Sequence, residues 1–200
     1  MSETSPLVGE LTRKPKGYVG LNHMTRGGDI VSILKVLHSP ELTLGEENYR
    51  RLSLMSATSW YPIATLLEML ELLGKKLGAP GLKSVGWNIF ATFHSEEARK
   101  HFDNVHDLLH ALDAMYHAGN KGHRIGNWTV TDFRPGYALL EKTTPHHCAM
   151  EEGIVEEAVR TMGVKATVDQ LECFRNGAPC CIFRVQSPVT DQRWSKVPPK

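Results

Sequence analysis

The apolar residues change their spacing near Gly126, and this change restricts the fold more than any other feature of the sequence. Upstream, as in residues 63–77, they recur every three to four positions, which predicts amphipathic helices. Downstream, Trp128 and Val130 alternate with threonines, which predicts strands. Helices followed by hairpins favour packing of the helices on an antiparallel sheet, so the sequence predicts an α+β fold.

The same spacing, together with turn residues, places the individual elements. In chain order, we predict helices over residues 29–38, 46–55, 59–77 (with Ser59 as N-cap), 82–93 and 96–117, a hairpin over 128–142, a helix over 150–162, and strands over 164–174 and 180–185. The C-terminal half is therefore hairpin, helix, hairpin, which predicts a four-stranded antiparallel sheet. The length suits one domain, for which we expect an irregular arm over 1–27, the domain over 28–187 and a polar tail over 188–200.

Charge and hydropathy exclude several classes of partner. Lys and Arg number 23 and Asp and Glu 22, so no basic excess indicates a nucleic acid or an anionic membrane. The longest apolar stretch, residues 63–77, contains four charged residues and is not a membrane span. The N-terminus lacks the pattern of a signal peptide, so we expect a cytoplasmic protein with its four cysteines reduced.

The last two predicted strands bring two cysteines together. Pairing them around the turn at 175–179 places Leu171 opposite Phe183 and Cys173 opposite Cys181, on one apolar face. Facing residues of an antiparallel pair lie about 4.5–5.5 Å apart at Cα, close enough for two thiolates to share a zinc ion. Two other interpretations stay open, because free cysteines are often small buried apolar residues and a cross-strand disulfide is also possible.

Further zinc ligands would come from the residues just before the helix at 150–162. His146, His147 and Cys148 all precede this helix, which should pack on the sheet. The candidate metal ligands are therefore Cys148, Cys173, Cys181 and His147.

Residues 128–185 resemble the C-terminal half of the 4-vinyl reductase domain family. The resemblance rests on PHHCAMEEGIVEEAVRTMG followed by VDQLECFRNGAPCCIFRV, in which a glycine-containing helix follows one cysteine and a short turn separates two others. The N-terminal helices match in order and character, around SWYPIATLLEMLELLG. The resemblance implies a dimeric fold shared with TRAPP-type subunits and, more distantly, with haem nitric-oxide-binding domains.

The same resemblance implies a structural zinc, as in the phenol-sensing members of the family. Their ligands would correspond to Cys173, Cys181 and Cys148, with a glutamate at the position of Gln170. An amide is a poor zinc ligand, so Gln170 departs from the pattern and leaves the fourth ligand open.

A histidine on the predicted helix 96–117 raises haem as an alternative cofactor. His101 falls between Phe102 and Val105 on the apolar face, where an imidazole can be an axial haem ligand or a hydrogen-bonded core residue. Neither a C-x-x-C-H attachment motif nor the Tyr-x-Ser-x-Arg propionate clamp of haem nitric-oxide sensors occurs.

Aromatic residues supply the candidates for a ligand pocket between the helices and the sheet. Such residues more often simply form a core, but Trp and His bring N–H groups that can orient a ligand in an apolar cleft. The candidates are Trp60, Trp87, Phe93, His101, Tyr116 and Trp128.

No catalytic residues are assigned, because neither a phosphate-binding glycine loop nor a nucleophile elbow is present. The leading hypothesis is a homodimeric, stand-alone sensory domain that binds a small apolar or aromatic molecule. The alternatives are a haem-based gas or redox sensor, an enzyme or accessory protein of tetrapyrrole synthesis, and a dimeric adaptor without a ligand.

Overall fold

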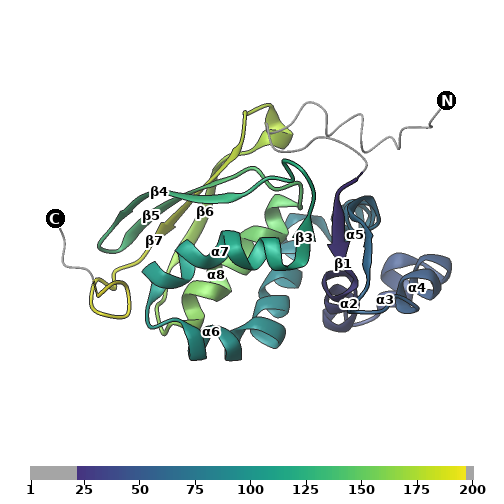
Figure 1. Ribbon diagram of the computed structural model, residues 1–200, viewed down its shortest axis with the longest axis horizontal. Coiled ribbons are helices and arrows are strands. Elements are labelled where there is room, and N and C mark those ends of the chain that lie inside the picture. Colours follow the sequence, from purple (N-terminus) through teal and green to yellow (C-terminus); the bar gives the residue numbers. More distant parts are fainter. Residues whose placement is uncertain (1–21, 197–200) are drawn as a thin grey trace.

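The computed structural model describes residues 22–196 and confirms the α+β fold, with helices packed on one side of an antiparallel sheet (Figure 1). The sheet has the order β4-β5-β7-β6. Its strands are β4 (Trp128–Arg134), β5 (Tyr137–Lys142), β6 (Thr167–Glu172) and β7 (Cys181–Gln186). Both predicted hairpins and the helix between them, α8 (Cys148–Thr161), are present.

The N-terminal half is helical, as predicted, but it also contains a small second sheet. Its helical segments are α2 (Gly27–Val36), α3 (Pro40–Leu44), α4 (Glu46–Ser53), α5 (Ile63–Ile89), the π-helical turn η1 (Phe90–His94), α6 (Ser95–His101) and α7 (Val105–Gly119). The small sheet has the order β2-β1-β3 and consists of β1 (Met24–Arg26), β2 (Trp60–Pro62) and β3 (Asn120–Lys121).

This small sheet corrects two expectations. The end of the predicted N-terminal arm is ordered as β1, although residues 1–21 lie outside the described part of the chain. Helix α5 begins at Ile63 and not beside Ser59, because the three residues before it pair with β1 instead. The predicted break after residue 77 is a kink at Gly78, whose φ of 66° suits glycine.

The long helix predicted over 96–117 is interrupted. α6 ends at His101, and Asn104 begins α7 as an N-cap, with its side-chain oxygen accepting from the Asp107 N–H at 3.0 Å. His101 therefore does not share one continuous helix with Val105, and the face predicted for its side chain does not apply. Its side chain is 68% exposed and lies 3.3 Å from Glu97, so the expectation that His101 faces the apolar interior is wrong.

Helix α8 packs against α5 more closely than ordinary side chains allow. A Cβ at Gly86 would lie 1.8 Å from the Met150 carbonyl oxygen, and one at Gly153 would lie 2.0 Å from that of Lys83. Glycine at both crossing points therefore sets the distance between the two helices. Lys83 adds ion pairs at 2.7 Å to Glu152 and Glu156 on α8.

The register of β6 and β7 differs from the prediction by a bulge. Glu172 pairs with Ile182, which agrees with placing Cys173 opposite Cys181, but Gln170 and not Leu171 pairs with Phe183. Leu171 is the extra residue, and it is 49% exposed. The bulge turns Gln170 to the face that carries Phe183 and Cys181.

The segment after β7 belongs to the packed domain at least as far as the structure describes it. Trp194 is fully buried, stacks on Phe133 at 5.4 Å, and donates from Nε1 to the Arg134 carbonyl at 2.8 Å. Residues 188–196 are thus not the loose polar tail that their composition suggested. Within the described residues, no helix combines the length and the apolar character needed to cross a membrane.

Candidate functional site

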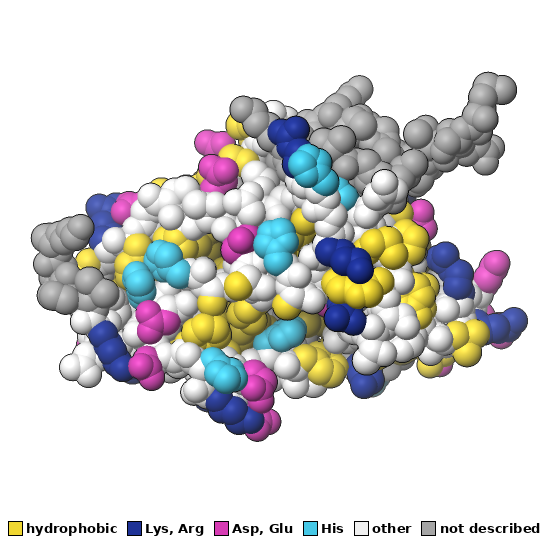
Figure 2. All heavy atoms as spheres, in the orientation of Figure 1, with side chains coloured by type: hydrophobic (Ala, Val, Ile, Leu, Met, Phe, Trp, Pro, Cys, Tyr) yellow, Lys and Arg dark blue, Asp and Glu magenta, His cyan; other side chains and the backbone are white. Residues whose placement is uncertain are grey.

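A cavity of about 290 Å³ lies between the N-terminal helices and α8. Its walls come from α2, α5, η1, α7 and α8, with Asn120 of β3, Trp128 of β4 and His146 of the loop before α8. Figure 2 shows the molecule from the side drawn in Figure 1. Hydrophobic side chains lie in a hollow near the middle of this view, in the region between α6 and α7. The volume is near the lower end of the ~300–1,000 Å³ of small-molecule sites.

Most of the lining is apolar. It consists of Ile33, Leu66, Ile89, Phe90, Leu112, Met115, Trp128, Met150, Ile154 and Val155. Several of these, such as Leu66 and Val155, are among the most buried residues described. An apolar body therefore finds favourable surroundings in most of the space.

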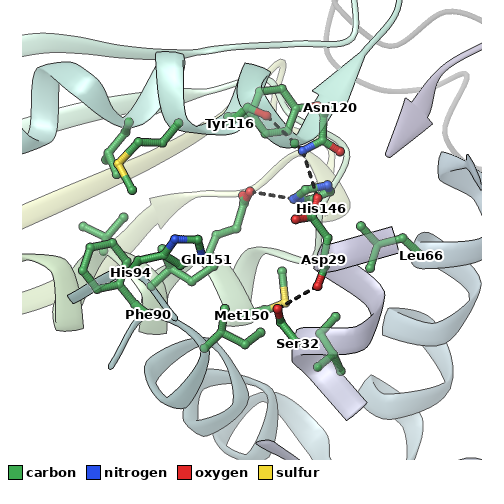
Figure 3. A pocket seen from close by; sticks show the side chains of 18 of the residues that line it. Asp29, Ser32, Leu66, Phe90, His94, Tyr116, Asn120, His146, Met150 and Glu151 are labelled. Atoms are coloured by element: carbon green, nitrogen blue, oxygen red, sulfur yellow. Dashed lines mark hydrogen bonds and ion pairs between the residues drawn. The ribbon is translucent and has the colours of Figure 1, made fainter. Parts of the chain in front are cut away.

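Polar side chains gather at one end of the cavity (Figure 3). The Asp29 carboxylate accepts from the Thr25 hydroxyl at 2.8 Å and from the Asn120 amide at 3.4 Å. Asn120 is 3% exposed, and its amide also donates to the Tyr116 carbonyl at 3.1 Å. Burial raises the pKa of Asp29 to about 6, against the lowering effect of the hydrogen bonds from Thr25 and Asn120.

His146 lies at the same end and belongs to a buried ion-pair network. Its Nδ1 is 3.3 Å from Glu151, and the same carboxylate pairs with Lys142 at 2.6 Å and accepts from Thr144 at 3.0 Å. Burial, with the nearby Lys142 ammonium, lowers the pKa of His146 to about 3, so its ring is neutral. With Nδ1 3.3 Å from this carboxylate, the favoured neutral tautomer carries its proton on Nδ1 and leaves Nε2 as an acceptor.

A second imidazole, His94, reaches the cavity from the π-helical turn η1. Figure 3 shows it beside Phe90, away from Asp29 and Asn120. Burial lowers its pKa, so His94 too is neutral at pH 7. The π-helical turn is itself a feature that is frequent at functional sites.

Of the six predicted ligand-binding residues, the structure brings two to the cavity. Tyr116 and Trp128 line it, and the Tyr116 hydroxyl donates to the Ile125 carbonyl at 3.0 Å. Trp60, Trp87 and Phe93 are not part of the lining, and a basic side chain lies 4.0–5.9 Å from each of their rings. His101 is exposed, for the reason given above.

The residues that sequence reasoning missed at the cavity are its polar ones. Asp29, Asn120 and Glu151 are far apart in the chain and belong to no recognisable motif. Only their positions near helix ends offer a signal, and an acidic residue in a first helical turn, such as Glu151, is ordinarily explained by the helix dipole alone. His146 was considered, but as a possible metal ligand.

Three of the predicted metal ligands lie together under the sheet. The Sγ atoms of Cys173 and Cys181 are 3.5 and 3.3 Å from that of Cys148, and all three lie within 4.8 Å of one another. A tetrahedral zinc site with Zn–S distances of about 2.3 Å separates its sulfurs by about 3.8 Å, so small shifts suffice to hold a zinc ion. The cysteines are free, without a disulfide.

The surroundings of these thiols favour an ionised sulfur. Hydrogen bonds from Cys173 and Cys181 lower the pKa of Cys148, and the Lys142 ammonium 3.8 Å away and the Gln170 amide add to this effect. Gln170, at the expected glutamate position, thus lies beside the cluster. His147 does not join it: its Nδ1 accepts from the Ala149 N–H at 3.3 Å, and its Nε2 lies beside Gly74 of α5.

Haem fits this cavity in its donor atoms but not in its volume or charge. The neutral rings of His94 and His146 are suitable iron ligands. Among the described lining residues, however, there are two carboxyl groups, Asp29 and Glu151, and no Lys or Arg to pair with two haem propionates. A tetrapyrrole also needs more room than about 290 Å³ provides.

Comparison with known proteins places the fold. No protein-family model matches the chain, and no curated protein matches its sequence. An H-NOX protein from S. oneidensis, a triple mutant in the Fe(II) ligation state, matches with a TM-score of 0.64 and 14% identity over 84% of this chain and 98% of that one. The Fe(II) unliganded H-NOX protein from K. algicida matches with a TM-score of 0.61 and 10% identity, over 81% of this chain and 96% of that one.

A further H-NOX structure, from work on heme distortion in that family, gives a TM-score of 0.61 and 13% identity over 86% and 97% of the two chains. The expected relation to haem nitric-oxide-binding domains is therefore confirmed for the fold, whereas the 4-vinyl reductase assignment finds no support in these comparisons. At such low identities the likeness concerns the fold alone: this chain has the fold of the H-NOX domains.

Proposed function

We propose that this chain is a small-molecule sensory domain whose ligand occupies the cavity between α2, α5, α7 and α8. The cavity itself carries this proposal, because apolar walls with polar groups at one end are typical of ligand sites. The walls come from helices that are distant in the sequence, so one occupant contacts all of them. Occupancy would favour the helix arrangement that closes on the ligand, which is how a sensory domain shifts its equilibrium.

Haem is the second candidate ligand. The H-NOX fold and the imidazoles of His94 and His146 favour it, while the two carboxyl groups and the volume of the cavity oppose it. Titration with haem, followed by absorbance in the Soret region, separates the candidates. A stoichiometric band that shifts on replacing His94 or His146 by Ala would establish haem, and a band typical of haem free in solution would exclude it.

We also propose that Cys148, Cys173 and Cys181 hold a structural zinc ion. The three sulfurs lie at nearly the required spacing, and the Lys142 ammonium, which also pairs with Glu151, lies 3.8 Å from Cys148 and favours its thiolate form. Metal analysis of purified protein should find about one zinc per chain. Cys181→Ser should lose it, whereas Cys180→Ser, which lies outside the cluster, should keep it. Substoichiometric zinc in the wild type would contradict the proposal.

The cavity is tested with three probes that share a phenyl body: phenethylamine, 2-phenylethanol and 3-phenylpropionate. A probe at ten times its Kd stabilises the folded state by about 1.4 kcal/mol, or about 3–6 °C in Tm. Met115→Trp should abolish this shift by filling the cavity, while Leu54→Trp adds the same indole at an exposed position and should not. If no probe shifts the wild type more than Met115→Trp, the cavity is not a ligand site. The homodimer and the cytoplasmic location remain predictions.

A further inference from the structure

Two residues at the polar end of the cavity carry hydrogen-bond acceptors for which residues 22–196 supply no donor. The Asn120 side-chain oxygen and the His146 Nε2 are buried and lack a hydrogen-bond partner among the described residues. Both residues are more than nine-tenths buried, at 3% and 7% exposed. Leaving a buried acceptor unpaired costs free energy, so an occupant with donors would gain from meeting them.

The orientation of both groups follows from their partners. The Asn120 amide nitrogen faces two acceptors, the Tyr116 carbonyl and the Asp29 carboxylate, which leaves its oxygen as the unpaired atom. The His146 Nδ1 faces the Glu151 carboxylate, which leaves Nε2 as the acceptor. The described lining residues contain no other fully buried side-chain nitrogen or oxygen without a partner.

The third acceptor, Asp29, also carries a charge that is not balanced. Glu151 pairs with Lys142 at 2.6 Å, but Asp29 has only the neutral donors of Thr25 and Asn120, and no cation pairs with it within residues 22–196. This lack of a counter-charge agrees with its raised pKa. A positive group placed here would stabilise the ionised carboxylate.

We propose that the ligand is a small primary ammonium compound with an apolar body, whose –NH₃⁺ group is held by Asp29, Asn120 and His146. An ammonium group has three donors, one for each acceptor, and supplies the missing charge. The apolar walls receive the body, and since a cavity of about 150 Å³ accommodates benzene, a phenyl ring with a short chain fits in about 290 Å³. This inference rests on the proposed function, because it specifies the ligand of the same cavity.

Calorimetric titration of the wild-type protein at pH 8 tests the head group. Phenethylamine should bind at least about tenfold more tightly than 2-phenylethanol, and 3-phenylpropionate should bind most weakly, because its carboxylate faces Asp29. The N,N,N-trimethyl derivative of phenethylamine keeps the charge without the donors and should also lose at least about tenfold. All of these comparisons between probes use the wild-type protein.

A matched pair of variants then tests Asp29. Asp29→Asn should weaken phenethylamine by at least about tenfold and leave 2-phenylethanol within about threefold. Asp103→Asn, at an exposed position outside the cavity, should change neither. If 2-phenylethanol or 3-phenylpropionate binds as tightly as the amine, the ammonium inference is wrong although the cavity remains a ligand site. If none of the probes binds in a way that Met115→Trp abolishes, both proposals fail.

Discussion

Replacing Asp29 by Asn should stabilise the protein at neutral pH, although it removes a charged group with two hydrogen bonds. Burial raises the pKa of this carboxyl from an ordinary 3.8 to about 6. Well below pH 3.8 the group is protonated in both the folded and the unfolded chain, so it does not change the free energy of unfolding. As the pH rises, the unfolded chain ionises first, so stability falls until the folded carboxyl is ionised above about pH 6.

The magnitude follows from the two pKa values. At about 1.4 kcal/mol for each pKa unit, the rise from 3.8 to about 6 corresponds to about 3 kcal/mol of lost stability above pH 6. Asparagine imitates the protonated carboxyl and can still accept from Thr25, so Asp29→Asn should gain about 1–3 kcal/mol at pH 8 and less than about 1 kcal/mol at pH 4.

Urea unfolding followed by circular dichroism at pH 4, 6 and 8 measures this difference. Subtracting the free energy of unfolding of the wild type from that of the variant at each pH removes the contributions of all other titrating groups, including His146 and His147. A variant that is less stable than the wild type at pH 8, or a difference that does not change with pH, would refute the reasoning. The same variant should bind phenethylamine less tightly, so stability and binding should change in opposite directions.

Four other substitutions test separate parts of the fold. Gly153→Ala should destabilise by about 2–4 kcal/mol, because its Cβ would meet the Lys83 carbonyl at 2.0 Å, whereas Gly28→Ala, with 3.4 Å to its nearest atom, should cost less than about 1 kcal/mol by thermal unfolding. Trp194→Ala should cost about 3–5 kcal/mol in urea unfolding, and an unchanged stability would show that residues 188–196 are not part of the domain. His101→Ala should leave stability within about 0.5 kcal/mol and probe binding unchanged by calorimetry, because the ring is 68% exposed.

The elements with strong periodicity could be predicted from sequence, and those that depend on tertiary context could not. Helix α8 and the two hairpins follow from clear patterns and turn residues. The strands β1, β2 and β3 have two or three residues each, too few to show alternation, and they form only because three distant segments meet. Asn104 was a recognisable N-cap, and overlooking it placed His101 on the wrong face.

The cysteine cluster could also be predicted from the sequence, whereas the polar end of the cavity could not. The cysteine cluster was predictable because Cys173 and Cys181 flank one turn, and the bulge at Leu171 lies beyond them in the ladder, so the register error did not affect them. The polar end of the cavity joins Asp29, Asn120 and His146, which belong to different elements and share no spacing. Their meeting depends on the packing of α2, α7 and the loop before α8.

The central claim, that the cavity binds a small molecule, is tested most directly by calorimetry of phenethylamine with Met115→Trp and Leu54→Trp side by side. We expect one binding site per chain in Leu54→Trp, with the affinity of the wild type, and no measurable heat of binding in Met115→Trp. Equal binding by the two variants would place the ligand elsewhere on the protein and contradict the claim.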